Sequence, residues 1–179
     1  MQRLVSITRK EDIYPQYQNT PIGHLLEYHN LSRPFDSFQS AELLIGMCMD
    51  NRKSLRIPDN FSFIIRSGGA NLRYSDFQVS FAISVGGIKS IALIGHTQCG
   101  MAGLNGRKEN FIEGMIKNAG WTREIAEEHF LAYSSFFEIG NPVDFTLNEA
   151  YRLRHRYPKI LVAPLIYKVE DNKLYLLPE

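Results

Sequence analysis

Two cysteines and one histidine are the strongest candidates for chemistry in this chain. The only cysteines are Cys48 and Cys99, and His96 stands three residues before Cys99. At that spacing a tight turn can bring an imidazole and a thiolate to one ion, and both are zinc ligands. Three protein ligands leave a fourth position open, as in catalytic rather than structural zinc centres. We therefore predict a catalytic zinc site of Cys48, His96 and Cys99.

A carboxylate and a guanidinium closely follow the first cysteine. The segment reads Cys48-Met49-Asp50-Asn51-Arg52, so three functional side chains are spaced by two and share a face if the chain is extended. Beside a metal, a carboxylate can accept the proton of bound water and orient it, while an arginine keeps the carboxylate ionised and fixed. We predict that Asp50 and Arg52 form a catalytic pair, and that the open metal position holds either water or, in a resting form, Asp50.

Other interpretations of these residues stay open. Cys48 and Cys99 can be ordinary buried thiols and His96 a hydrogen-bonded histidine at a strand end. A redox role for the cysteines is another possibility, although they lack Cys-x-x-Cys spacing. Asp50 and Arg52 alone would be a surface ion pair of little energetic value. The other histidines lack a second ligand at helical spacing and are not assigned to the site: His24, His29, His129 and His155.

The two cysteine segments follow buried strands. Leu43–Met47 and Ser90–Ile94 are continuous apolar runs, typical of strands buried on both faces of a parallel sheet. Cys48 directly follows the first run, and His96 comes two residues after the second. Binding sites of open α/β sheets lie just beyond the carboxyl ends of their strands. Both halves of the candidate site therefore lie where this kind of fold places its functional site.

The rest of the chain alternates strand and helix patterns. Further strands are predicted at Phe61–Ile65 and Ile160–Val162. Helices are predicted at Ile22–Tyr28 with Thr20 as N-cap and Pro21 at the first position, Phe77–Val85 with Ser75 as N-cap, Phe111–Asn118, Thr122–Phe137 and Asp144–Tyr157. A hairpin is predicted over Leu165–Leu176, with its turn at residues 170–172, which tolerate left-handed dihedrals. This order predicts an α/β fold with a mainly parallel central sheet flanked by helices and a C-terminal hairpin strand.

Length and charge set the organisation and exclude some partners. With 179 residues, 44% of them hydrophobic, we expect a single core. Residues 1–34, interrupted by three prolines, are predicted to be an N-terminal arm that packs on a neighbour or on its own domain, and residues 35–179 the zinc-binding α/β domain. A net charge of +1 gives no field to attract nucleic acid or an anionic membrane. Without an apolar leader or a spanning segment, we expect a soluble, cytoplasmic protein.

The two motifs resemble those of the β-class carbonic anhydrases. That family has a Cys-x-Asp-x-Arg segment followed, some forty to fifty residues later, by His-x-x-Cys-Gly. Residues 48–52 and 96–100 match these signatures, and residues 63–71 are similar to the Arg-Asn-Ala-Gly strand end between them. The likeness runs from about Glu42 to Met101. Ser67 replaces the family's asparagine, and Ala163-Pro164 replaces a His-Gly that often precedes the final strand.

The resemblance implies a function. Zinc would be bound by the two cysteines and His96, the Asp50–Arg52 pair would gate or orient the fourth ligand, and metal-bound hydroxide would attack carbon dioxide. The enzyme would be a carbonate dehydratase, a zinc lyase that forms bicarbonate reversibly, with Gly69 and Gly100 near the substrate. Gln39 and Gln98 are candidates for a substrate-holding glutamine, without a supporting motif.

The family also implies a homodimer or higher homo-oligomer, with the arm of residues 1–34 as an interface element. Two alternatives remain. One is a hydrolase of carbonyl sulfide or carbon disulfide on the same site. The other is a non-catalytic zinc- or bicarbonate-binding protein in which Asp50 permanently fills the fourth position.

Overall fold

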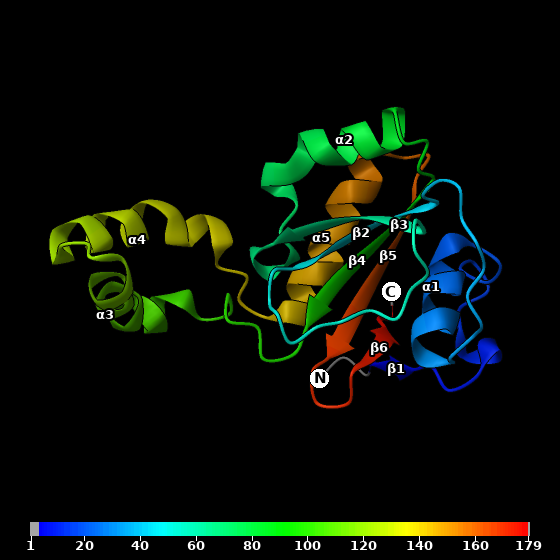
Figure 1. The fold of residues 1–179 in the computed structure, drawn as a ribbon, viewed down its shortest axis with the longest axis horizontal. Helices are drawn as coiled ribbons and strands as arrows, with labels where there is room; N and C mark the ends of the chain where they lie inside the picture. The colour runs from blue at the N-terminus through cyan, green and yellow to red at the C-terminus, as the bar shows by residue number, and fades with distance from the viewer. Residues whose placement is uncertain (1–3, 179) are drawn as a thin grey trace.

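The computed structural model describes residues 4–178, and within them six strands form one sheet in the order β1-β6-β5-β4-β2-β3 (Figure 1). The strands are β1 (Val5–Ser6), β2 (Leu43–Cys48), β3 (Ser62–Ser67), β4 (Ser90–His96), β5 (Leu161–Lys168) and β6 (Lys173–Leu176). The four neighbouring strands β3, β2, β4 and β5 are parallel, whereas β6 and β1 are added antiparallel at one edge. This arrangement confirms the predicted mainly parallel α/β sheet with its C-terminal hairpin.

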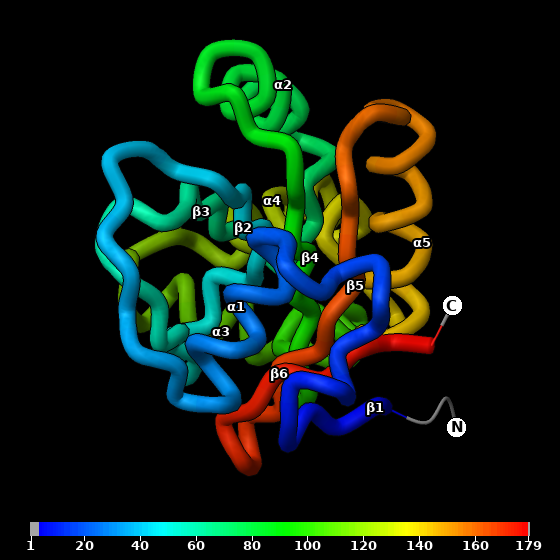
Figure 2. The backbone as a smooth tube through the Cα atoms, turned by 90° about the vertical axis from the view of Figure 1, so that its right-hand side faces the viewer, coloured from blue at the N-terminus to red at the C-terminus, as the bar shows by residue number. Residues whose placement is uncertain are grey.

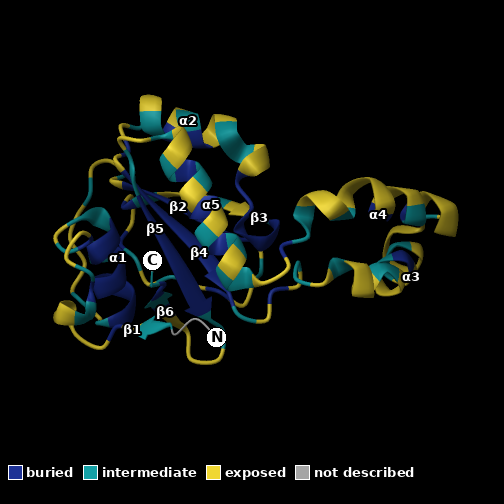
Figure 3. Cartoon of the chain, turned by 180° about the vertical axis from the view of Figure 1, so that it is seen from behind, coloured by how far each residue is buried: buried dark blue, intermediate teal, exposed yellow. Residues whose placement is uncertain are grey.

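Helices cover both faces of the sheet. The α-helices are α1 (Pro21–Asn30), α2 (Asp76–Ser84), α3 (Lys108–Ala119), α4 (Arg123–Phe137) and α5 (Pro142–Arg156), with short 3₁₀ turns at Lys10–Asp12, Gly68–Ala70, Arg73–Ser75 and Leu104–Arg107. Figure 2 shows α1 and α5 on opposite sides of β4 and β5. The α3–α4 hairpin projects away from the sheet, and Figure 3 shows that most of its surface is exposed or half-buried. The sheet with α1, α2 and α5 therefore forms the body of the fold, and the α3–α4 hairpin lies outside it.

The centre of the sheet is buried on both faces, because apolar helices pack against each. Every residue of β2 and β4 is buried. Along β2, Leu43, Ile45 and Met47 pack into the cluster that includes α1, while Leu44 packs with residues of α2 and α5. This alternation follows from the two-residue period of a strand. Continuous apolar runs thus identified β2 and β4 correctly.

Two details of the predicted elements differ from the structure. Ile160–Val162 is not a separate strand, because β5 continues through Pro164 into the hairpin. Pro164 pairs with Leu93 of β4, whereas the pairing of β5 with β6 begins at Leu165. At Pro164 the strand therefore has a paired neighbour on one side only, a position where a proline without an N–H is tolerated. Ser75 precedes α2 but makes no capping hydrogen bond. The predicted hairpin turn is confirmed, with Asn172 at a φ of 58°.

Residues 4–30 are tied to the chain's own sheet. Thr20 caps α1 by accepting a hydrogen bond from the Gly23 N–H, as its place before Pro21 predicts. The side chains of Ile22, Leu25 and Leu26 are completely buried against the sheet. Among residues 4–178, no helix combines the length and apolar character needed to cross a membrane.

His29 joins α1 to two other segments as a neutral imidazole. The Arg56 backbone N–H donates to Nδ1 at 3.1 Å, so Nε2 carries the proton and donates to the Asn172 carbonyl at 3.0 Å. Burial lowers the pKa of His29 below its usual 6.5. Protonation of Nδ1 would also break the bond from Arg56. The fold therefore requires this histidine to stay uncharged.

His29 should make the protein less stable in mild acid. Because its native pKa lies below 6.5, the unfolded chain takes up the proton first, so stability is full above pH 6.5 and falls as the pH drops below it. Urea unfolding at about pH 7.5 and about pH 5 should show a smaller acid-induced loss in His29→Gln than in the natural protein. The exposed His155 provides the control, since His155→Gln should keep the full loss. An equal loss in His29→Gln would contradict this account.

Candidate metal centre

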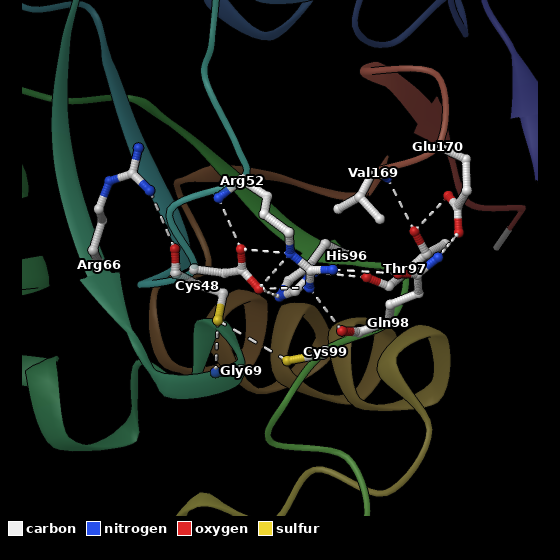
Figure 4. A network of polar contacts seen from close by, with 11 residues as sticks. Cys48, Arg52, Arg66, Gly69, His96, Thr97, Gln98, Cys99, Val169 and Glu170 are labelled. Carbon is white, nitrogen blue, oxygen red and sulfur yellow. Dashed lines mark hydrogen bonds and ion pairs between the residues drawn. The ribbon is translucent and has the colours of Figure 1, made fainter.

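The two halves of the site lie at the carboxyl ends of adjacent parallel strands. Cys48 is the last residue of β2 and His96 the last residue of β4. A turn at Thr97 and Gln98 then returns Cys99 toward the sheet. The structure brings Cys48 Sγ, Cys99 Sγ and a ring nitrogen of His96 within 4.8 Å of one another (Figure 4). The three predicted ligands thus form one cluster.

The donor atoms of this cluster fit a zinc ion. All three residues are buried, with the two sulfurs 4.0 Å apart. His96 Nδ1 lies 2.8 Å from the Thr97 carbonyl, which can only accept, so Nδ1 carries the hydrogen and Nε2 presents a lone pair. Nε2 is buried and has no hydrogen-bond partner among the described residues. Two sulfurs and a neutral imidazole nitrogen are a typical zinc donor set, and a bound ion would satisfy the unpaired nitrogen.

The two thiols share a proton unequally. The hydrogen bond from the Cys99 thiol lowers the pKa of Cys48, and the same contact raises the pKa of Cys99. The Gly69 N–H also donates to Cys48 Sγ at 3.3 Å and supports the negative sulfur. A cation can replace the shared proton, because thiolates are the form that binds metal. The cluster is therefore arranged to carry negative charge before any metal binds.

Asp50 and Arg52 form a bidentate ion pair beside the cluster. Arg52 NH2 donates to Asp50 Oδ2 at 2.7 Å, and Arg52 Nε donates to Oδ1 at 3.1 Å. Hydrogen bonds from the Arg52 side chain hold the pKa of Asp50 well below its usual range. Asp50 Oδ2 lies 4.0 Å from His96 Nε2, the nitrogen that faces the sulfurs. An ionised carboxylate thus lies next to the candidate ligands.

The predicted extended chain across this pair is wrong. Residues 51 and 52 form a turn, and the Arg52 backbone N–H donates to Asp50 Oδ1 at 2.9 Å. Aspartate commonly bonds the backbone two residues ahead in this way. The turn, rather than the two-residue period of a strand, brings the carboxylate and the guanidinium together.

The two glycines named from the sequence differ in their surroundings. Gly69 has a φ of 65°, and an added Cβ would lie 2.5 Å from Ile139 Cγ2, so only glycine fits where its N–H meets Cys48. At Gly100 an added Cβ would meet no atom within 4 Å. The surroundings of Gly100 therefore do not require a glycine, unlike those of Gly69. Substrate contact by either glycine stays a prediction.

Several residues beside the site were not singled out as part of it by their sequence pattern. Lys53 is 3% exposed, and its ammonium has no hydrogen-bond partner within the described part of the chain. Burial lowers the pKa of Lys53, while the nearby Cys48 and Asp50 charges oppose that effect. Thr97 and Glu170 belong to a hydrogen-bonded chain that reaches Arg52 through Gln98. Of these residues, the sequence offers only Gln98 as a candidate, one of two glutamines without a supporting motif.

An apolar cavity of about 370 Å³ adjoins the cluster. Met49, Gly68 and Met101 form one wall, and Met101 packs against Cys48 and Cys99, so this wall borders the cluster although none of the three candidate ligands lines the cavity. The other wall belongs mainly to the α3–α4 hairpin: Leu104, Phe111, His129, Phe130, Tyr133, Ser134 and Phe137. The cavity suits a small uncharged molecule, because apolar walls favour neutral over charged species.

The fold is that of the β-class carbonic anhydrases. The chain superimposes on isoform I of the β-carbonic anhydrase from Trichomonas vaginalis with a TM-score of 0.62 and 19% identity, over 82% of this chain and 89% of that one. The carbonic anhydrase from Streptococcus mutans gives 0.61 and 15%, over 93% and 100%.

A carbon disulfide hydrolase in its apo form also shares the fold. Its TM-score is 0.56 at 20% identity, over 78% of this chain and 80% of that one. No family model and no curated protein matches the sequence. The resemblance seen in the two motifs is thus confirmed for the fold.

Proposed function

We propose that this protein is a zinc-dependent carbonate dehydratase that converts carbon dioxide and water reversibly into bicarbonate and a proton. The convergence of Cys48, His96 and Cys99 beside the ionised Asp50 carries the proposal. The two motifs, and a fold shared with carbonic anhydrases, support it. Both cysteines are free thiols, so we also propose a reducing, cytoplasmic location in which they can act as ligands.

Each residue of the site has a distinct task in this reaction. Cys48, His96 and Cys99 would hold the ion. Zinc bound there supplies a Lewis acid that makes water more acidic. The Asp50 carboxylate accepts a hydrogen bond from the attacking water and orients its lone pair toward the substrate. Because its pKa is lowered, Asp50 orients the water without retaining the proton. Arg52 keeps the carboxylate ionised and in place.

The cavity provides a place for the substrate. Carbon dioxide is neutral and small, whereas bicarbonate is an anion that loses solvation among apolar walls. The cavity beside Met49 and Met101 therefore favours entry of the gas and departure of the charged product. Holding carbon dioxide beside an oriented water in this cavity accelerates the chemical step, because the two reactants then meet in the required geometry.

Metal analysis combined with stopped-flow hydration of carbon dioxide tests the proposal. We expect one zinc ion per chain and a hydration rate that rises from neutral to alkaline pH. The rise should lie above about pH 7, since two thiolates donate more charge to the metal than the imidazoles of a three-histidine site. One zinc ion per chain without hydration at any pH would contradict the enzyme and favour a non-catalytic zinc- or bicarbonate-binding protein.

A hydrolase of carbonyl sulfide or carbon disulfide is the second candidate. It is favoured by the apolar character of the cavity and by a carbon disulfide hydrolase among the proteins that share the fold. Turnover of the three gases under the same conditions separates the candidates. Faster turnover of either sulfur gas than of carbon dioxide would replace our proposal.

We further propose that the protein assembles as a homodimer or higher homo-oligomer, with residues 1–34 as an interface element. Apolar surface outside residues 1–34 supports the assembly itself. Phe63 and Ile64 are exposed on β3, the edge strand of the described sheet. Phe77 and Val85 of the neighbouring α2 are 79% and 70% exposed.

A further inference from the structure

A chain of hydrogen bonds links the Asp50–Arg52 pair to the distant β5–β6 turn (Figure 4). Arg52 NH1 donates to Gln98 Oε1 at 3.2 Å, and Gln98 Nε2 donates to Glu170 Oε1 at 2.9 Å. Thr97 Oγ1 donates to the other oxygen of Glu170 at 2.7 Å. Both oxygens of Glu170 therefore bond residues of the turn between His96 and Cys99.

The polarity of this chain is fixed throughout. A guanidinium can only donate and a carboxylate can only accept, so the Gln98 amide between them has one possible orientation. Thr97 Oγ1 accepts from the Val169 N–H at 3.0 Å, which directs its own hydrogen to Glu170. Each bond thus depends on the type of group at the next position.

The backbone of the turn adds a second connection to Arg52. Gln98 has a φ of 54°, in the left-handed region that is uncommon for residues other than glycine. This conformation directs the Gln98 carbonyl to Arg52 NH2, which donates to it at 2.9 Å. Such a backbone persists where surrounding contacts hold it, and the Glu170 contacts to Thr97 and Gln98 meet that need.

From these contacts we infer that Glu170 is a positioning residue that holds Arg52 against Asp50 through Gln98, and so limits the turning of Asp50 toward the metal ligands. Asp50 Oδ2 is already 4.0 Å from His96 Nε2, so a modest rotation brings it to the cluster. That rotation must break its bonds to Arg52, which Gln98 and Glu170 keep in place. The inference rests on the proposed function in assuming a metal held by Cys48, His96 and Cys99.

Exchanging the two partners tests the chain of bonds in the full-length protein. In Gln98→Glu two carboxylates face each other, so the side chain at position 98 is no longer held by Glu170 and can draw Arg52 away from Asp50, which then competes for the metal. In Gln98→Glu combined with Glu170→Gln, the amide at position 170 donates to the carboxylate at position 98, so the link between the two positions is restored with its direction reversed. Azide titration of the cobalt-substituted protein, followed by visible absorption, reports whether Asp50 blocks the fourth position.

We expect the Kd for azide to rise about tenfold in Gln98→Glu, as for other outer-shell partners, and to return to within about twofold of the natural value in the double variant. If the new carboxylate at position 98 simply repelled azide, binding would be weak in both the single and the double variant, because that charge beside Cys99 is present in each. Weak binding in the double variant would therefore overturn the inference. Asp171→Asn is the control, since it removes a charge from the same turn without touching Gln98 and should leave azide affinity unchanged.

A measurement on the metal-free protein separates this inference from the proposed function. Exchange of the Arg52 Nε–H with solvent, followed by NMR, should be faster in Gln98→Glu and slow again in the double variant. Equal exchange in all three proteins would contradict the positioning role whatever the metal content. A natural protein that lacks metal or hydration activity overturns the proposed function instead.

Discussion

Replacing Cys48 by serine should remove the bound zinc and, with it, the hydration of carbon dioxide. A serine hydroxyl stays protonated near neutral pH, so it cannot replace the thiolate that the contact with Cys99 and the Gly69 N–H favour at this position. Two ligands would remain where the structure provides three. Activity should fall by more than the roughly 10- to 100-fold loss typical of an outer-shell residue. Zinc analysis of the purified variant and stopped-flow hydration measure both effects.

The same result is expected for Cys99→Ser and His96→Gln, because each removes one of the three donors. His155→Gln, at an exposed position outside the site, should keep its zinc and full activity. Circular dichroism separates loss of the metal from loss of the fold. If Cys48→Ser retains one zinc ion per chain, Cys48 is not a ligand, and the view of both cysteines as ordinary buried thiols gains support.

The convergence of the cluster could be predicted because local patterns mark where its strands end. Apolar runs identified β2 and β4, and the polar residues directly after them mark the carboxyl ends of buried parallel strands. The two strands are neighbours in the sheet, so Cys48 and His96 lie close without any further device. The turn that returns Cys99 is also local, since it spans only Thr97 and Gln98.

Other features depend on contacts that a single segment does not encode. Glu170 lies 72 residues from Gln98, and only the folded hairpin brings them together. The apolar residues of α1 are part of the core because they pack against one face of the sheet. In the sequence alone, the prolines around this helix instead indicate an irregular arm. Strand β1, which pairs with β6, has only two residues and is too short to show a periodic pattern in the sequence.

Asp50 orients water in the proposed reaction, and we therefore expect Asp50→Asn to retain zinc while its hydration rate falls by roughly 10²-fold. An amide oxygen accepts hydrogen bonds less strongly than a carboxylate. The amide N–H₂ would also face the Arg52 guanidinium, which can only donate. Water near the ligands would then be poorly oriented, and Arg52 would be left without its partner.

The pH dependence distinguishes orientation from base catalysis. Because hydrogen bonds from Arg52 lower the pKa of Asp50, its carboxylate is ionised throughout the neutral and alkaline range. Asp50→Asn should therefore lower the hydration rate at every pH and leave the shape of the profile unchanged. Arg52→Lys, which keeps the charge but loses the bidentate contact, should cause a smaller loss. If Asp50→Asn hydrates carbon dioxide at the natural rate, Asp50 and Arg52 form a surface ion pair without a part in the reaction.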